Sequence, residues 1–152
     1  MDYAYGSYVL SDDPARLDLH AMYAYLRQAY WCAEIPFEVL HRAVHNSLCI
    51  GVYDKDGAQV GLARFISDYA TFCYVCDVYV LEGHRGRGLA KELLSLAARH
   101  PQLQGLRRWM LVTRDAHGLY HRMGFKVIDH PERFMEILVP DIYKSGGKTC
   151  GD

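Results

Sequence analysis

The sequence predicts an α/β domain, and two observations carry that prediction. Short apolar stretches rich in β-branched residues recur along the chain and alternate with segments of helical periodicity. One of them, residues 72–81, runs without a break into a basic, glycine-rich turn that opens a helix, and another short strand follows at 109–113. Strand, helix and strand in this order predict a parallel crossover.

Length and composition fit one folded domain. The chain has 152 residues, of which 51% are hydrophobic, and a formal net charge of −1. These values argue against disorder and against nucleic-acid binding by bulk charge. No apolar run approaches the roughly 20 residues of a membrane span, and the first residues lack the cationic start of a signal peptide. We therefore expect a cytoplasmic protein that binds no membrane.

The first half of the chain is expected to contain three strands and two helices. A strand over 5–10 precedes Asp13-Pro14, a cap and first-turn pair that starts a helix reaching about residue 30. Pro36 starts a second helix that extends through residue 44. Strands over 48–53 and 59–66 flank Asp56-Gly57, which predicts a tight antiparallel hairpin.

The second half continues with the strand over 72–81, a helix over 88–99 that Pro101 ends, and the strand over 109–113. A short helix follows at 116–123. Strands at 125–128 and 134–139 are expected to close the sheet. Residues 1–143 would form the domain, and the polar segment 144–152 a frayed tail.

Five cysteines, an odd number, argue against a disulfide framework. Cys73 and Cys76 form a C-x-x-C pattern within a strand, where positions three apart point to opposite faces and cannot share a tetrahedral metal. We therefore expect structural thiols and no metal site.

The turn after residue 81 has the chemistry of a phosphate site. Gly86 and Gly88 let consecutive N–H groups converge on an anion, and the following helix adds its positive dipole end. The third glycine of a dinucleotide motif is replaced by Lys91, and the Lys-Ser/Thr of a P-loop by Leu89-Ala90. Both nucleotide readings are therefore weak.

What remains, Arg-Gly-Arg-Gly-Leu-Ala over 85–90, resembles the pyrophosphate-binding motif [Q/R]-x-x-G-x-[G/A] of the GNAT superfamily of acyl-CoA-dependent N-acyltransferases. A second segment, 116–125, is similar to that family's A-x-x-[LF]-Y-x-x-x-G-F. The matching residues are Arg85, Gly88, Ala90, Ala116, Leu119, Tyr120, Gly124 and Phe125. More loosely, the resemblance extends from about residue 5 to residue 139.

The resemblance implies a mixed, twisted sheet of about seven strands with helices on both faces, and acetyl-CoA as the acyl donor. In that family the pantetheine arm lies between the splayed fourth and fifth strands. The residues expected to bind the cofactor are Val78, Tyr79, Val80, Arg85, Gly86, Arg87, Gly88, Leu89, Ala90 and Lys91.

The implied reaction needs a proton acceptor and a proton donor. An amine with a pKa near ~10 arrives protonated and must lose a proton, and the departing thiolate must gain one. Tyr120 matches the family's general acid. Asp77, in an apolar strand where the family's strand bulges, is either the base or a structural carboxylate, and Glu82 is a weaker candidate. A backbone N–H near Val78 would stabilise the oxyanion.

The acceptor pocket is expected between the first two helices and the neighbouring strands, with Tyr30, Trp31, Glu34 and Arg64. An aromatic pair beside a carboxylate suits a cationic or aromatic amine, although aromatic residues at a helix end also serve as core. Thr113 stands where many family members carry an asparagine that contacts the pantetheine.

Three functions remain in view. The first is an N-acetyltransferase that joins acetyl-CoA and a small-molecule or peptide amine in a ternary complex, with Cys76 leaving a narrow opening for a covalent route. A non-catalytic acyl-CoA-binding module and a nucleotide-binding protein are the alternatives. The sequence leaves open whether the chain forms a homodimer.

Overall fold

The computed structural model describes residues 1–144, so the tail expected at 144–152 lies, apart from Lys144, outside the described residues. Six strands form one sheet in chain order: β1 Asp2–Tyr5, β2 Tyr8–Ser11, β3 Leu48–Tyr53, β4 Gln59–Ser67, β5 Phe72–Val80 and β6 Arg108–Met110. All neighbouring strands are antiparallel except β5 and β6, which are parallel. The mixed α/β sheet and its parallel crossover are thus confirmed.

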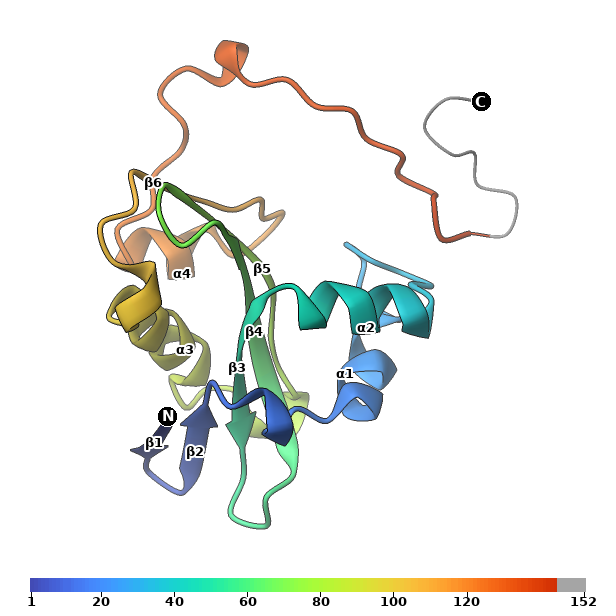
Figure 1. Cartoon of the computed structure of the whole chain (residues 1–152), viewed down its shortest axis with the longest axis vertical. Helices are drawn as coiled ribbons and strands as arrows, with labels where there is room; N and C mark the ends of the chain where they lie inside the picture. Colours follow the sequence, from blue (N-terminus) through green and yellow to red (C-terminus); the bar gives the residue numbers. More distant parts are fainter. Residues whose placement is uncertain (145–152) are drawn as a thin grey trace.

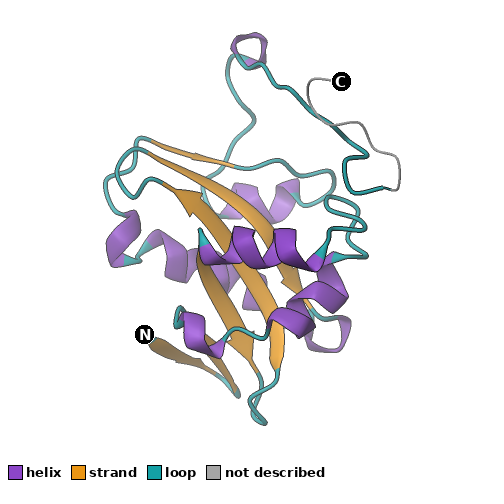
Figure 2. Ribbon diagram, turned by 45° about the vertical axis from the view of Figure 1, so that its right-hand side comes forward, coloured by secondary structure: helices purple, strands orange, loops and turns teal. Residues whose placement is uncertain are grey.

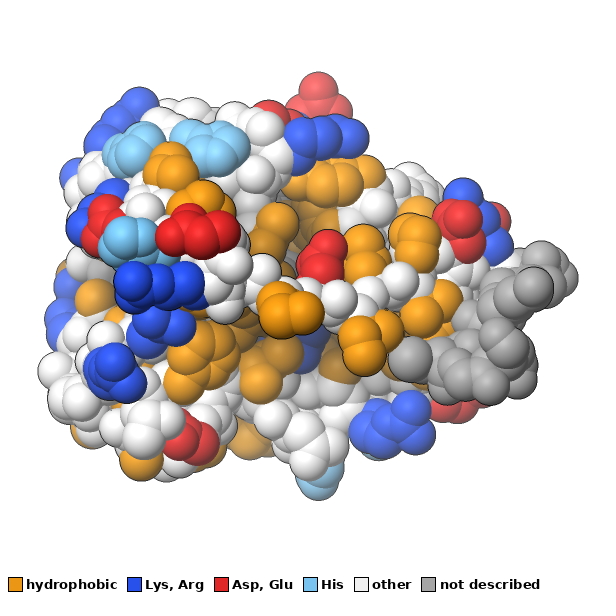
Figure 3. Space-filling model, turned by 90° about the horizontal axis from the view of Figure 1, so that it is seen from above, with side chains coloured by type: hydrophobic (Ala, Val, Ile, Leu, Met, Phe, Trp, Pro, Cys, Tyr) orange, Lys and Arg blue, Asp and Glu red, His pale blue; other side chains and the backbone are white. Residues whose placement is uncertain are grey.

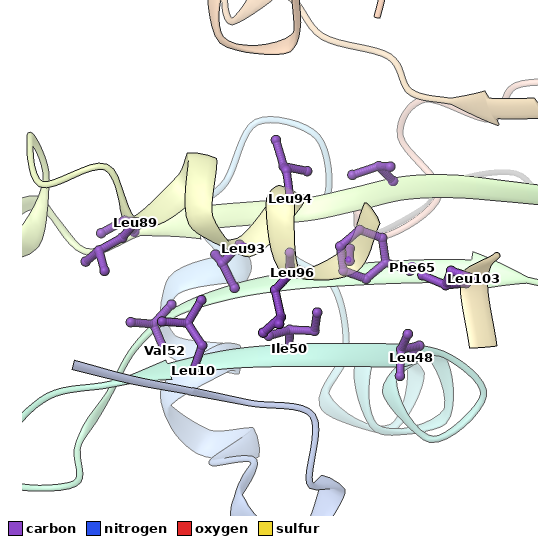
Figure 4. Packing of buried hydrophobic residues seen from close by; sticks show 14 of the residues in the cluster. Leu10, Leu48, Ile50, Val52, Phe65, Leu89, Leu93, Leu94, Leu96 and Leu103 are labelled. Carbon is purple, nitrogen blue, oxygen red and sulfur yellow. The ribbon is translucent and has the colours of Figure 1, made fainter. Parts of the chain in front are cut away.

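Helices cover both faces of this sheet (Figures 1 and 2). They are α1 Leu19–Leu26, α2 Phe37–His45, α3 Leu89–Ala98 and α4 His117–Arg122. Leu48, Ile50 and Val52 of β3 pack in the cluster that contains α3, whereas Cys49 packs in the cluster that contains α1 and α2. This division follows from the period of two along a strand. Figure 4 shows the first cluster, with leucines of α3 over residues of β2, β3 and β4.

Two elements that were each predicted as continuous consist of two shorter elements in the structure. The strand expected over 5–10 is a hairpin, because Gly6 adopts a φ of 58° and Tyr5 pairs with Tyr8. The helix expected to begin at Pro14 is first a 3₁₀ turn, Pro14–Arg16. Asp18 then caps α1, accepting a hydrogen bond from the Ala21 N–H at 3.0 Å.

The prediction of strands at 125–128 and 134–139 is wrong for this chain, and the sheet has six strands rather than seven. From residue 123 to residue 144, the end of the described chain, the segment after α4 contains only the 3₁₀ turn Pro131–Arg133 and otherwise extends away from the sheet as an arc (Figure 1). Its residues have strand-like composition, but a strand requires a backbone partner, and none of the described residues supplies one.

Among residues 1–144, every helix is too short or too polar to cross a lipid bilayer.

Candidate active site

A β-bulge interrupts β5 in the middle of its pairing with β4. The register advances by two residues in β4 but by three in β5, between Cys76 and Tyr79. Asp77 and Val78 therefore lie opposite a single residue. Asp77 has a φ of 51°, in the left-handed region that Asp and Asn tolerate better than most side chains. This bulge is the feature that the family resemblance implied.

The bulge directs the Asp77 carboxylate into a buried network. Its Oδ1 accepts a hydrogen bond from Trp31 Nε1 at 2.8 Å, and its Oδ2 accepts one from Arg64 Nε at 2.6 Å. Arg64 also donates to Ser47 Oγ at 3.0 Å. Both carboxylate oxygens are thus engaged by donors, one of them cationic. Of the two roles left open for Asp77, this geometry favours the structural one.

Arg64 remains charged in this network. Burial lowers its pKa, but the charge and hydrogen bond of Asp77 outweigh burial, and the net pKa is raised above the usual value for arginine. Asp77 is buried and Arg64 is half-buried, so removal of either partner would leave the other charge without compensation.

Tyr120 lies half-buried on α4, with its ring edge-on to Phe125 at a centroid distance of 5.8 Å. Burial raises its pKa above 10, and the neighbouring Tyr30 and Cys76 contribute in the same direction. Its hydroxyl has no hydrogen-bond partner among the described residues. A phenol with a raised pKa stays protonated at neutral pH, which suits a proton donor.

Cys76 is a poor nucleophile in this environment. Burial is the main cause that raises the pKa of its thiol to about 12, with Asp77 adding to the effect against Arg64. At neutral pH the thiol is therefore protonated, whereas a covalent route needs the thiolate. Residues 1–144 contain no group of His, Cys, Asp and Glu side chains arranged for a metal ion.

The two parallel strands separate before β5 ends. Pairing of β5 with β6 stops at Tyr74 and Met110, although β5 continues to Val80. The Leu81 N–H bonds to the Val60 carbonyl of β4, so alternation directs the main chain of Tyr79 to β4 and that of Val80 into the opening. Of the three residues expected to pair with pantetheine, Val80 thus faces the gap, Tyr79 faces β4, and Val78 lies in the bulge, where alternation is interrupted.

The glycine-rich turn lies between this opening and α3. Gly86 and Gly88 have φ values of 74° and 77°, and Gly88 is the N-cap residue of α3. The turn is exposed, with Leu89 as its buried anchor and Ala90 partly buried beside it. Lys91 is exposed in the first turn of the helix. The free N–H groups of that turn, together with the Lys91 ammonium and the two arginines of the motif, can bind an anion.

Residues outside the motif hold its two arginines. Arg85 Nε donates to the Val80 carbonyl at 2.9 Å, and its Nη2 lies 3.4 Å from Tyr25 Oη. Arg87 Nη1 donates to Tyr8 Oη at 2.9 Å. Tyr8 and Tyr25 are not recognisable as site residues from the sequence, because their roles depend on contacts with residues 79 and 60 positions away.

The expected acceptor residues are only partly brought together. Tyr30 packs edge-on against Trp31 at 5.1 Å, and Arg114 stacks 3.8 Å above the Tyr30 ring. A cavity of about 310 Å³ is lined by Tyr30, Trp31, Cys32 and Ala33 together with residues 138–144. Arg64 joins the cluster through Asp77. Glu34 is exposed and makes no side-chain hydrogen bond to any described residue.

Two further residues lie at the edge of the site. Thr113, at the position of the family's asparagine, accepts a hydrogen bond from the Ala116 N–H at 3.0 Å and so helps to start α4. Glu82 is exposed in the 3₁₀ turn Glu82–His84, beyond the end of β5.

Comparisons with known proteins agree with this geometry. The sequence profile of the Acetyltransferase (GNAT) family matches residues 11–125. A Gibberella zeae protein whose name includes acetyltransferase is 35% identical over 144 residues, with 80% of each chain covered. A crystal structure from Xanthomonas campestris, described as an acetyltransferase of the GNAT family, is 45% identical with a TM-score of 0.89 and covers 93% of this chain and 100% of its own.

A structure from Deinococcus radiodurans, at 18% identity, has a TM-score of 0.72 and covers 99% of this chain and 100% of its own. At this identity it shows the shared fold alone. The family profile spans the glycine-rich turn, the bulged strand and the tyrosine of α4. The chain therefore belongs to the GNAT family of acetyltransferases.

Proposed function

We propose that this chain transfers the acetyl group of acetyl-CoA to a primary amine by direct attack in a ternary complex. One observation carries the proposal: β5 parts from β6 beyond Tyr74 on its way to the turn before α3, and Tyr120 lies beside Tyr30, which lines the cavity next to Trp31. A thioester in that gap would have its phosphates on the turn and its carbonyl beside the bulge.

Acetyl-CoA would be held at two places. The N–H groups from Gly86 to Lys91 and the side chains of Arg85 and Arg87 would bind the pyrophosphate. The main chain of Val78 and Val80 would pair with the pantetheine amides. Arg85 donates a hydrogen bond to the Val80 carbonyl, so cofactor binding would require the Arg85 side chain to rotate towards the phosphates.

The chemical step forms one bond and breaks one. The neutral amine nitrogen attacks the thioester carbon, and the Val78 N–H stabilises the oxyanion. Collapse breaks the C–S bond, and Tyr120 donates its proton to the departing sulfur. The amine gives up its proton to water or to a carboxylate, for which Asp77 is the candidate that the sequence indicates. Solvent later reprotonates Tyr120.

The acceptor would bind in the cavity beside Trp31. The Tyr30 and Trp31 rings offer an apolar surface there, and the Arg64–Asp77 pair neutralises its own charge. A small molecule or peptide end with an aromatic or aliphatic group next to its amine fits these walls. Glu34, which is exposed and close to Cys32 and Ala33 in the sequence, would attract the amine as a cation. The cytoplasmic location expected from the sequence stays part of the proposal.

The test is release of free CoA from acetyl-CoA in the presence of a panel of primary amines. We expect turnover with a subset of amines that contain an aromatic or aliphatic group. Absence of turnover with every amine, together with a rise in melting temperature on adding acetyl-CoA, would instead indicate a non-catalytic acyl-CoA-binding module. A rise in melting temperature with ATP but not with acetyl-CoA would contradict the cofactor assignment.

A further inference from the structure

The segment from 125 to 143 exposes more apolar side chains than a segment without a partner normally does. Met135 is 97% exposed, Ile137 86%, Val127 69% and Leu138 66%. The run Phe-Met-Glu-Ile-Leu-Val over 134–139 is apolar on both faces, as in strands that are buried on both sides. Seen from above, apolar side chains gather on this face of the molecule (Figure 3).

A groove of about 550 Å³ lies at the outer edge of β6. Its floor and sides include Leu94 of α3, Trp109 and Met110 of β6, and Met123 and Phe125 after α4. The backbone from 124 to 130 forms its far side. Within residues 1–144, β6 pairs with a strand on one side only, so its other edge is open to a further strand.

Only Phe134 of the chain's own 134–139 segment lines this groove, and the residues that follow it lead away from it. Phe134 lies under Arg108, with the guanidinium 5.1 Å from the ring centre. Tyr143 packs against the core cluster of α1 and α2. Between these two anchors the chain crosses the top of the molecule as an extended arc (Figure 1).

We propose that the groove is the docking site for residues 134–139 of a second copy, so that two chains exchange this segment and each completes the sheet of the other. The arc already has an extended conformation that a strand could adopt, and six residues span roughly 20 Å. Arg108 and Arg133 line the groove, whereas Glu136 is the only charge in the segment. The exchange is symmetric, because every chain has one groove and one segment.

The first measurement is the mass of the full-length protein by sedimentation velocity. We expect a dimer of the 17.4 kDa chain. Ile137→Glu should give a monomer, because docking would bury the side chain at position 137, and burying an added carboxylate is costly. The side chain of Ile137 is exposed within one chain, so the variant should keep the folded circular dichroism of the parent. The matched control is Ile66→Glu on β4, two strands from the open edge, which should remain a dimer.

Hydrogen exchange provides the second measurement, since it distinguishes strand exchange from dimerisation through another surface. The amides of 135–139 should exchange about 10²-fold more slowly in the parent than in Ile137→Glu. A monomeric parent, or a dimeric Ile137→Glu variant, would overturn the proposal. Rapid exchange in a dimeric parent would do so as well. A monomer with slow exchange would mean that the segment fills the groove of its own chain. None of these readouts depends on catalysis.

Discussion

At the scale of single residues, Asp77 shows how the backbone sets the chemistry of the site. The bulge gives this residue a left-handed conformation and brings its carboxylate between Trp31 and Arg64. A regular strand would direct the side chain to one face of the sheet and separate these partners. The position of Trp31, beside the proposed acceptor cavity, therefore depends on the carboxylate of this ion pair.

Asp77→Asn tests this dependence. Asparagine tolerates the left-handed conformation but leaves Arg64 charged and buried, so the free energy of unfolding should fall by about 3 kcal/mol. Turnover should fall by a similar factor at every pH, because the defect is one of shape. Urea denaturation and a pH–rate profile measure the two effects. Adding Arg64→Gln should restore part of the stability. Recovery of turnover at high pH would instead assign the base to Asp77.

Tyr120→Phe tests the proton donor. Removing the hydroxyl should lower kcat by about 10²-fold and leave acetyl-CoA binding unchanged, since the proton is needed only in the transition state. In the parent, activity that requires the protonated phenol should be lost only above pH 10, because the pKa is raised. The control is Tyr53→Phe, which removes a buried hydroxyl without a partner and should leave kcat unchanged. Equal turnover in the parent and Tyr120→Phe would assign Tyr120 to packing.

At the scale of elements, the turn before α3 depends on glycine backbone. An added Cβ at Gly88 would lie 2.9 Å from Tyr5 Oη and disturb the hydrogen bond from this hydroxyl to the Arg87 carbonyl, now 3.3 Å long. Gly57 of the β3–β4 hairpin has a similar φ of 83° with open space around it. Comparing substitutions at the two glycines therefore distinguishes the effect of backbone strain from damage to the proposed phosphate site.

Gly88→Ala should weaken acetyl-CoA binding by about tenfold or more, a loss of about 1.4 kcal/mol. Gly57→Ala should lower the free energy of unfolding about as much as Gly88→Ala does, by about 1 kcal/mol for the left-handed conformation. It should leave acetyl-CoA binding unchanged. Titration calorimetry with acetyl-CoA and urea denaturation of both variants provide the comparison. Unchanged affinity in Gly88→Ala would move the phosphate site away from this turn.

The turn between β4 and β5 is held by one carboxylate. Asp68 accepts hydrogen bonds from the Thr71 hydroxyl and from the N–H groups of Ala70, Thr71 and Phe72. The Thr71 hydroxyl is the largest cause that lowers the pKa of Asp68 below 3.8, followed by the Thr71 and Ala70 N–H groups. The charged form is thus favoured in the folded state, and the turn positions the start of β5.

The lowered pKa predicts how Asp68→Asn depends on pH. Because the folded pKa lies below the unfolded one, the stabilisation by Asp68 is complete above about pH 4 and is lost as the pH falls through the folded pKa. Urea midpoints should therefore differ between parent and variant at pH 7 and converge at low pH. A difference that persists unchanged at pH 2 would mean that the carboxylate charge is not responsible.

At the scale of the whole molecule, the exchanged segment would couple folding to association. If part of the sheet comes from a second chain, folding includes a step that depends on protein concentration. The melting temperature of the parent should rise as the concentration increases. That of Ile137→Glu should be lower and independent of concentration. A parent with a constant melting temperature over a hundredfold range would contradict the coupling.

Most of the fold could be predicted from the sequence because its signals are local. Apolar periodicity located the helices and the central strands, Asp56-Gly57 located the hairpin, and the motif residues located the turn before α3. The difference at the start of the first helix came from competing local signals. Asp13 and Asp18 both cap a helical turn, and only the packing of Met22 and Leu26 makes the second one start α1.

The sequence by itself determined the family and the chemistry available, since Arg85 to Ala90 and Ala116 to Phe125 are contiguous and their motifs can be matched without coordinates. Only the tertiary structure decided which residues meet. The contacts of Trp31 with Asp77 and of Arg87 with Tyr8 join segments far apart in the chain, and so does the cavity that Tyr30 shares with residues 138–144. It also decided that residues 134–139 do not pair within their own chain. Strand composition is a local property, whereas pairing needs a partner edge that only the folded molecule provides.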